Sequence, residues 1–369
     1  MASVGTQVYS SDYNAVQVKV RTVLGDGYPF GVNTIYSEYG YGATLLSNPV
    51  TNIREYNTST IASNATTGSF TLTLTNIVGA KIGKIVNTTG TVSGSIITAV
   101  DSTNNSITIN NSTTSVVYSG NQISTYYNSS ILITKQQWQN LEDDVNTINK
   151  HQFNTNFAGY GTIAGKVTYT NLTSLNSVID TLTLSRNTVH PSQLTLDPYL
   201  AERTVPYQWG GLGNKGIQSL ATVQFNSTDE MQYFFNSGGE ILFGGQGPTT
   251  ISSAQDTAWY TLLNTVFLNT SARFTRTEFI RVGDSAYTWY QVLDGNPPYD
   301  INYISISAQK FTNYILFAVR FQDGHVPIGA SPADNVSSGA GYRIYQKRAT
   351  GAFTGAQIVS VTLNNFTVV

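Results

Sequence analysis

The stretch STDEMQYFFNSGGEILFGG, residues 227–245, decides how the second half of the chain folds. Ser227 is followed three residues later by Glu230, a capping-box pattern that predicts the start of a helix. Gly238 predicts its end, because glycine readily adopts the left-handed conformation that follows a helix C-terminus. EILFGG is then a short apolar strand. We therefore expect the aromatic end of this helix to pack against a sheet.

The sequence on either side of this stretch extends the same layout. SSAQDTAWYTLLNTV, 252–266, predicts a second helix. Strands are expected in ARFTRTEFIRV, YTWYQVL, INYISISAQ, YILFAVRFQ and IVSVTLNNFTVV, whose alternation favours an antiparallel sheet with one buried face. We predict an α+β domain over 220–369, with core residues Phe234, Phe235, Trp259 and Leu262. The prolines and the run WGGLGNKG in 191–219 predict a flexible linker without regular elements.

The first half of the chain carries the periodicity of amphipathic helices. Apolar residues recur at helical spacing in 10–25 and in 134–151, and a third helix is expected near 172–182. The stripe residues proposed for packing are Tyr13, Val16, Val20, Trp138, Leu141, Val145 and Ile148. Two stripes of this kind bury each other in a hairpin within one chain, or form a seam between neighbouring copies. Residues 1–57 and 128–190 are predicted to form this helical N-terminal module.

A segment of different composition separates the first two helices. Residues 58–127 are rich in Thr, Ser, Asn, Val and Ile. Short runs that alternate apolar with hydroxyl residues are separated by turn residues, which is typical of a small all-β domain. The helical periodicity resumes directly afterwards, so we interpret this segment as an inserted domain.

The composition limits the classes of function. Charged residues are 11% of the 369, the formal net charge is −2, and there is no cysteine. Without a basic cluster there is no footprint for nucleic acid, and no apolar run is long enough for membrane insertion. A weakly charged chain is poorly protected from self-association, which suits a protein that works inside an assembly. The N-terminal residues lack a secretory pattern, which favours release by cell lysis.

The residues that usually carry chemistry are scattered. The three histidines, His151, His190 and His325, stand far apart and in no metal-ligand spacing. Asp323-Gly324-His325 is the best acid–base pair, and we interpret it as a solvated turn. The acids of LEDDV, 141–145, are expected on the solvated face of a helix. No phosphate-binding glycine motif is present. We therefore predict no catalytic residues, no cofactor and no metal site, and a protein that is not an enzyme.

A tyrosine-rich connector, 27–42, offers the best candidates for ligand binding. Aromatic faces stack on sugar rings, so Tyr28, Tyr36, Tyr39 and Tyr41 are candidate glycan contacts. The competing interpretation, which we favour, is that these tyrosines serve protein contacts, because tyrosine buries a large area at a small entropic cost.

Several blocks together resemble the virion structural proteins of tailed phages that infect cyanobacteria. They are SVGTQVYSSDYNAVQVKVRTVLGDG, GYGATLLSNPVT, ITKQQWQNLEDDVNTINKHQ, VQFNSTDEMQYFFNSGGEILF, SSAQDTAWYTLLNTV and FAVRFQDGHV, which cover about two-thirds of the chain. The FFNSGGEI block and the AW-TLL pattern are the most specific. In such proteins the first two helical blocks usually lie close in sequence, whereas 58–127 separates them here. The resemblance supplies no catalytic residues.

The sequence thus predicts an α+β, β-rich multidomain protein and, from the resemblance, a non-enzymatic virion component of the tail, baseplate, neck or fibre. Its expected partners are copies of itself in a homo-oligomer and other virion proteins, and its expected location is the virion, assembled in the host cytoplasm. One alternative is a receptor-binding fibre module that recognises host cell-surface polysaccharide. Another is a hydrolase of envelope polymers, which needs a pair of opposed carboxylates.

Overall fold

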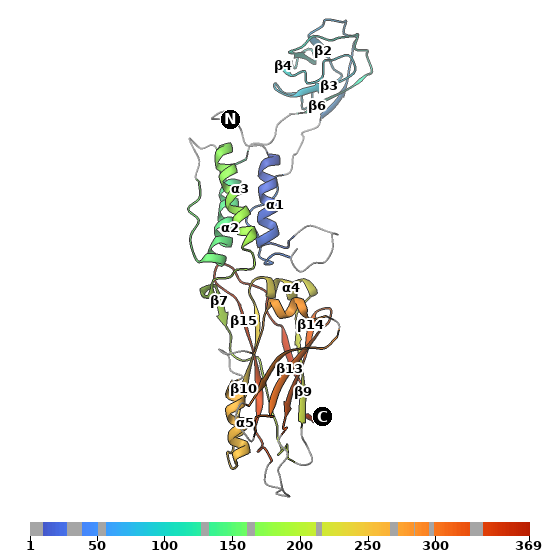
Figure 1. Cartoon of the computed structure of the whole chain (residues 1–369). Helices are drawn as coiled ribbons and strands as arrows, with labels where there is room; N and C mark the ends of the chain where they lie inside the picture. The colour runs from blue at the N-terminus through green and yellow to red at the C-terminus, as the bar shows by residue number, and fades with distance from the viewer. Residues whose placement is uncertain are drawn as a thin grey trace. The chain divides into compact units, whose positions relative to one another are not determined.

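A computed structural model of the chain describes residues 10–27, 39–50, 57–126, 133–160, 167–211, 216–265, 272–283, 285–294, 299–324 and 335–369 (Figure 1). The predicted class is confirmed, because the described residues form an α+β fold rich in antiparallel strands. The chain divides into two compact units. One comprises Met1–Asn14, Pro49–Thr134 and Val167–Tyr169, and the other comprises Ala15–Asn48, Lys135–Lys166 and Thr170–Val369.

The inserted segment forms a small antiparallel domain, here called the β module. Its strands are β1 (Asn57–Thr60), β2 (Thr71–Thr73), β3 (Ile85–Asn87), β4 (Ile97–Asp101), β5 (Ser106–Ile109) and β6 (Gln122–Tyr126). They make two three-stranded sheets, in the orders β1-β6-β3 and β2-β5-β4. The buried cluster of the module consists of Ile, Leu, Val and Ala side chains, among them Leu72, Ile107 and Val117. Alternation of apolar and hydroxyl residues places the first kind inside and the second outside.

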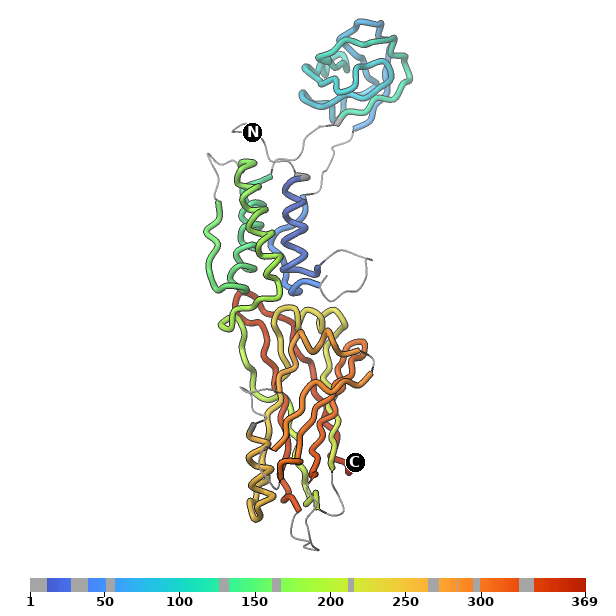
Figure 2. Tube along the Cα trace, in the orientation of Figure 1, coloured from blue at the N-terminus to red at the C-terminus, as the bar shows by residue number. Residues whose placement is uncertain are grey.

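Three helices form where the sequence predicts them. They are α1 (Ser10–Leu24), α2 (Lys135–Phe153) and α3 (Tyr169–Leu184), and Figure 2 traces them side by side. The apolar positions of α3, Leu172, Leu175, Ile179 and Leu182, are buried. Most helical stability in proteins comes from the packing of an amphipathic face, so the burial of such faces is what stabilises these helices.

The remainder of the chain forms two antiparallel sheets that face each other, here called the C-terminal sandwich. The first sheet has the order β11-β10-β15-β7, with β8 also on β15; the second has the order β12-β13-β14-β9-β16, with β17 on β9. Their strands are β7 (Leu194–Leu196), β8 (Ala201–Thr204), β9 (Gly216–Gln224), β10 (Glu240–Gln246), β11 (Arg273–Phe274), β12 (Tyr287–Leu293), β13 (Tyr303–Lys310), β14 (Tyr314–Gln322), β15 (Gly341–Ala349), β16 (Ser360–Leu363) and β17 (Thr367–Val368). The expectation of one sheet is corrected to two.

A single core fills the space between the two sheets. It combines residues of both, such as Phe243 of β10 and Phe317 of β14, whose ring centroids lie 5.1 Å apart. The predicted core residues Phe234, Phe235, Trp259 and Leu262 all belong to it. The helices around the sandwich are α4 (Thr228–Asn236), α5 (Ala254–Thr265) and α6 (Arg276–Arg281), and α5 packs on β10.

Local signals determine how the segment 227–245 folds. Ser227 caps α4, because its side chain accepts a hydrogen bond from the Glu230 backbone N–H. The Glu230 carboxylate accepts from Asn226 Nδ2 at 2.8 Å, so the capping box is only half formed. Gly238 has φ +85°, and a Cβ at that position would meet Val189 at 2.7 Å. Glycine is therefore required both for the turn and for the close packing.

Two predictions for the C-terminal half are wrong. Residues 191–219 are not a linker, since they contain a short 3-10 helix (Pro191–Gln193), β7, β8 and the first residues of β9. β7 and β8 pair with successive parts of β15, so together they act as one edge strand. ARFTRTEFIRV is not a strand beyond Phe274, because Thr275 and Glu278 form a complete capping box that starts α6.

Candidate functional site

The predicted packing stripe lies inside the chain. Each of its members is at most 3% exposed; they are Tyr13, Val16, Val20, Trp138, Leu141, Val145 and Ile148. The stripe is thus covered by other residues of the same chain, as the interpretation of packing within one chain requires. A seam between copies would have to use other side chains, because this stripe has no free surface.

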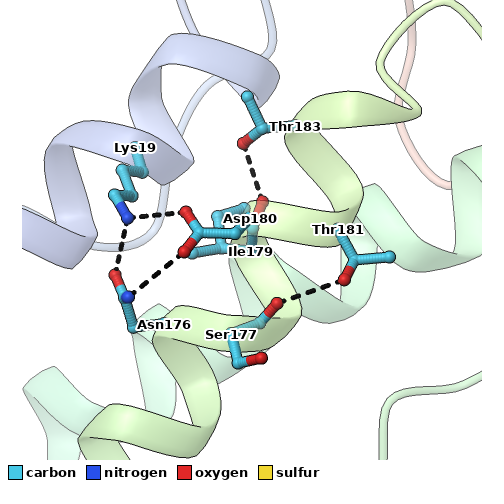
Figure 3. Close-up of polar contacts among 7 residues, drawn as sticks. All are labelled: Lys19, Asn176, Ser177, Ile179, Asp180, Thr181 and Thr183. Carbon is cyan, nitrogen blue, oxygen red and sulfur yellow. Dashed lines mark hydrogen bonds and ion pairs between the residues drawn. The ribbon is translucent and has the colours of Figure 1, made fainter.

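Polar side chains join α1 to α3 outside that stripe (Figure 3). Lys19 Nζ donates to Asp180 Oδ1 at 2.6 Å and to Asn176 Oδ1 at 2.9 Å. Asn176 Nδ2 donates in turn to Asp180 Oδ2 at 3.3 Å. On the same helix, Thr181 and Thr183 donate to backbone carbonyls four residues earlier. The contact between α1 and α3 at Lys19 is therefore polar, and hydroxyl groups elsewhere on α3 bond to the backbone of their own helix.

The ring of Tyr41 is not exposed for stacking on a sugar ring. Its side chain is 2% exposed, and its hydroxyl donates to the Arg186 carbonyl at 2.7 Å and accepts from Gln152 Nε2 at 2.9 Å. Its ring stacks on Phe353 and meets His151 edge-on. Burial raises the pKa of the Tyr41 hydroxyl above its usual range. Tyr41 therefore serves protein packing.

Tyr39 is half-buried rather than freely presented. It lies edge-on to Tyr233, with ring centroids 5.9 Å apart, and its hydroxyl is 3.3 Å from Asp229 Oδ1. Burial, followed by the nearby Asp229, raises the pKa of Tyr233 to about 12. Tyr28 and Tyr36 fall outside the described residues.

His151 lies in an aromatic pocket between Tyr41 and Phe353. Its side chain is fully buried, and no described group meets the geometry of a hydrogen bond to either ring nitrogen. Burial lowers the pKa of His151 to about 4, and the neighbouring Ser237 backbone opposes the shift only in part. The imidazole is therefore neutral at pH 7. His190 caps the short 3-10 helix through Nδ1, and His325 falls outside the described residues.

The prediction of a solvated face for LEDDV is wrong at Asp144. This residue is 1% exposed, and its carboxylate oxygens accept from the backbone N–H groups of Leu46 at 2.9 Å and Ser47 at 2.8 Å. Burial raises the pKa of the carboxyl, and these hydrogen bonds oppose the rise. A cavity of about 390 Å³ lies beside it, lined by Leu24, Gly42, Ala43, Thr44, Leu46, Asp144, Thr147, Ala352, Phe353 and Thr354. Asp144 thus fastens the 46–47 segment to α2.

Two further buried carboxylates also bind backbone N–H groups. Asp256 accepts from Ser337 N at 2.7 Å and Ser252 N at 2.9 Å. Burial pushes its pKa upward, but these bonds and those of the two serine hydroxyls hold the pKa below its usual range. Asp323 accepts from Gly211 N at 2.8 Å. The acid of the predicted Asp-Gly-His turn is therefore a buried structural group.

The start of WGGLGNKG is a fixed turn rather than part of a flexible loop. Gly210 and Gly211 both have positive φ, and a Cβ on Gly210 would lie 2.5 Å from Asp323 Oδ2. Trp209, just before them, is buried edge-on against Trp259. These residues anchor the turn in the core of the sandwich, and 212–215 fall outside the described residues.

The β module carries a polar groove that the sequence did not lead us to expect. It encloses about 410 Å³ and is lined by Thr58, Asn87, Thr88, Thr89, Gln122, Ile123 and Ser124. The polar residues themselves are visible in the sequence of β1, β3 and β6 and in the segment after β3. The groove could not be predicted, because only the pairing of β1, β6 and β3 brings those residues together.

The part of the chain that the structure describes contains neither a candidate metal site nor a candidate membrane span. No group of three or more His, Asp or Glu side chains there is arranged to hold a metal ion. No described helix is both long and apolar enough to cross a bilayer.

Comparisons of the chain with known proteins gave no match to a family model, to a curated protein or to a solved structure.

Proposed function

We propose that this protein is a non-enzymatic structural component of a tailed-phage particle, in its tail, baseplate, neck or fibre, and that it assembles with copies of itself and with other virion proteins. The sequence blocks that resemble such proteins motivate the proposal. The structural observation that supports it is the use of the buried carboxylates. Asp144, Asp256 and Asp323 each accept backbone N–H groups and so hold separate segments together.

The distribution of charge also supports an assembly role. With 11% charged residues, the surface depends on hydroxyl and amide groups, which cost less to desolvate at a contact than ions do. Such a surface opposes association weakly, because net charge and charge repulsion are what keep proteins apart. Exposed apolar side chains on the helices, such as Val18 and Leu184, are candidate contacts because the main stripe is already covered.

Two measurements test the proposal. Light scattering of the purified chain should give a mass of two or more times the 40.0 kDa of one chain. Mass spectrometry and a cryo-electron microscopy map of purified particles should find the chain at a fixed copy number and in a symmetric position. A monomer that is absent from particles, or turnover of an envelope polymer that is abolished by one Asp or Glu substitution, would contradict it.

A further inference from the structure

The groove of the β module lies on the outer face of the β1-β6-β3 sheet. The register pairs Thr58 with Ser124 and Ser124 with Asn87, so these three residues form one row across three strands. Cross-strand partners point to the same face of a sheet, and Gln122 shares that face because it lies two residues from Ser124. The opposite face carries Val86 and contributes to the buried cluster. The sheet therefore turns Val86 toward the buried cluster and the row of hydroxyl and amide groups toward the groove, with the buried Ile85 beside that row.

The segment that follows β3 closes one side of the groove. Thr88 is buried and its hydroxyl donates to the Gln122 carbonyl at 2.8 Å. This bond fixes the backbone at Thr88 and holds the neighbouring Thr89 beside the row. A volume of about 410 Å³ falls within the range of small-ligand sites and is sufficient for a short oligosaccharide segment.

Most of the polar groups that line the groove have unused hydrogen-bonding capacity. Four of the lining residues are exposed: Thr58, Asn87, Thr89 and Gln122. Their side chains make no hydrogen bond to the residues that the structure describes. Each carboxamide offers two donors and one acceptor oxygen, and each hydroxyl offers both functions. This combination matches the vicinal hydroxyls of a sugar, which also donate and accept.

The charge of the module narrows the class of ligand. Within 57–126 the charged residues are Lys81, Lys84 and Asp101, and none of them lines the groove. Lys84 Nζ donates to the Gly79 carbonyl at 2.6 Å, and Asp101 accepts from Thr103 and Asn104. Phosphate backbones and anionic lipid surfaces are recognised through Lys and Arg clusters. The groove lacks that chemistry.

We propose that this groove binds a neutral glycan through the side chains of Thr58, Asn87, Thr89 and Gln122. The site differs from the tyrosines of the 27–42 connector, and it does not depend on the particle role, since the isolated chain is sufficient to test it. The groove is open and its lining contains no aromatic ring, so the affinity of a single site is expected near 1 mM, on the order of the weakest specific complexes. Multiple copies in an assembly would raise the effective affinity without any new contact.

The test uses the full-length chain and saturation-transfer NMR with defined hexasaccharides. The neutral probes are hexamers of glucose, mannose, galactose and N-acetylglucosamine, and the acidic probe is a hexamer of galacturonic acid. We expect transfer to at least one neutral probe, and a loss of affinity of about tenfold in the double variant Asn87→Ala, Gln122→Ala. Both side chains are exposed and neither has a described hydrogen-bond partner, so the variant should fold normally, which circular dichroism checks.

The matched control is Asn111→Ala, which removes a carboxamide of the same module that does not line the groove. Unchanged binding in this control, together with loss in the double variant, supports the proposal. It is overturned if no neutral hexamer is bound at about 10 mM, roughly ten times the expected dissociation constant. Preference for the acidic hexamer, or equal binding by the double variant, also overturns it. None of these outcomes alters the mass or particle location that tests the proposed function.

Discussion

The β module and the C-terminal sandwich fill their antiparallel cores with different side chains. The module core is aliphatic. The sandwich core combines aliphatic side chains with many aromatic rings in direct contact, such as Phe235 stacked on Phe279 at 4.2 Å and Trp209 edge-on to Trp259 at 4.7 Å. A buried aromatic ring removes about 150–250 Å² from water, and ring pairs add a further contribution. The sandwich thus gains more stability per core residue than the module.

Their surfaces differ as well. Ion pairs link β15 to the β7–β8 segment of the sandwich: Arg348 Nε lies 2.7 Å from Asp197 Oδ2, just after β7, and Arg343 Nε lies 3.1 Å from Glu202 Oε2 of β8. The charged residues of 57–126 are Lys81, Lys84 and Asp101 alone, and the groove of the module is lined mainly by hydroxyls and amides. A large aromatic core suits a stable scaffold, whereas a small neutral module suits the presentation of a hydrogen-bonding surface. The two regions should therefore respond differently to mutation, acid and heat.

The largest effect is expected from Phe235→Ala. The Phe235 ring contacts those of Phe234, Phe274 and Phe279, and its removal leaves a cavity in the core. We expect the free energy of unfolding of the sandwich to fall by about 3–5 kcal/mol. All four tryptophans lie outside the module, so tryptophan fluorescence in a denaturant titration reports on the sandwich and helices alone.

The control for this change is Tyr260→Ala, which removes a ring that is 43% exposed on α5. It should cost under about 1 kcal/mol. The module transition, followed by NMR signals of its valine and isoleucine methyl groups, should stay where it is in both variants. Equal losses at the two positions would show that the aromatic core does not carry the stability assigned to it.

Acid should destabilise the unit that contains His151 and leave the β module almost unaffected. The pKa of His151 is about 4 in the folded chain against 6.5 for a free side chain, so the unfolded state binds more protons between these values. The stabilising contribution is complete above pH 6.5 and is lost as the pH falls toward 4. A difference of this size corresponds to about 3 kcal/mol. Asp101 is the only carboxyl residue within 57–126.

This prediction is measured as the difference in free energy of unfolding between the wild type and His151→Phe, at about pH 7 and about pH 4.5, an interval that covers most of the loss of the contribution. Subtraction cancels the titration of carboxyl groups such as Asp144, whose raised pKa acts in the opposite direction. The wild type should lose more stability than the variant on acidification. If both proteins lose the same amount, His151 is not buried in the neutral form.

The same small truncation should shift the two melting temperatures by different amounts. Ile107 in the module and Ile306 in the sandwich are both fully buried. Ile→Val should cost about 1 kcal/mol at either site. That loss shifts the melting temperature by about 4–8 °C in a domain of roughly 60–100 residues and by about 2–4 °C in one of roughly 150–250 residues. Differential scanning calorimetry should resolve both transitions, and a single cooperative transition would refute the independence of the two regions.

Features that depend on local periodicity could be predicted from the sequence. The helices α1, α2 and α3 lie where the apolar stripes indicate, because a helical repeat is visible within one segment. The strands β13 and β14 follow from strict alternation for the same reason. The Gly238 turn could likewise be predicted, since few residues other than glycine adopt positive φ.

Features that depend on distant partners could not be predicted. Asp144 stands beside Asp143 in an acidic run, and only the approach of the 46–47 backbone distinguishes the buried carboxylate from the solvated one. β7 and β8 are short, and they exist because β15, far later in the chain, offers hydrogen-bonding groups. The polar groove has the same origin, since its row of residues spans three strands. Tertiary pairing decided each of these cases.

The smallest effect is expected where charge is used at an exposed surface, a contact that the β module barely employs. Lys19 and Asp180 have side chains that are 40% and 53% exposed, so water screens their attraction. A double-mutant cycle with Lys19→Ala and Asp180→Ala should give a coupling of about 0.2–1 kcal/mol. The coupling should shrink in about 1 M NaCl, because the screening length there is about 3 Å. The melting of the module should not respond to either substitution. A coupling above about 2 kcal/mol would instead mean that the α1–α3 pair is shielded from water, for example by a neighbouring copy of the chain seated over it.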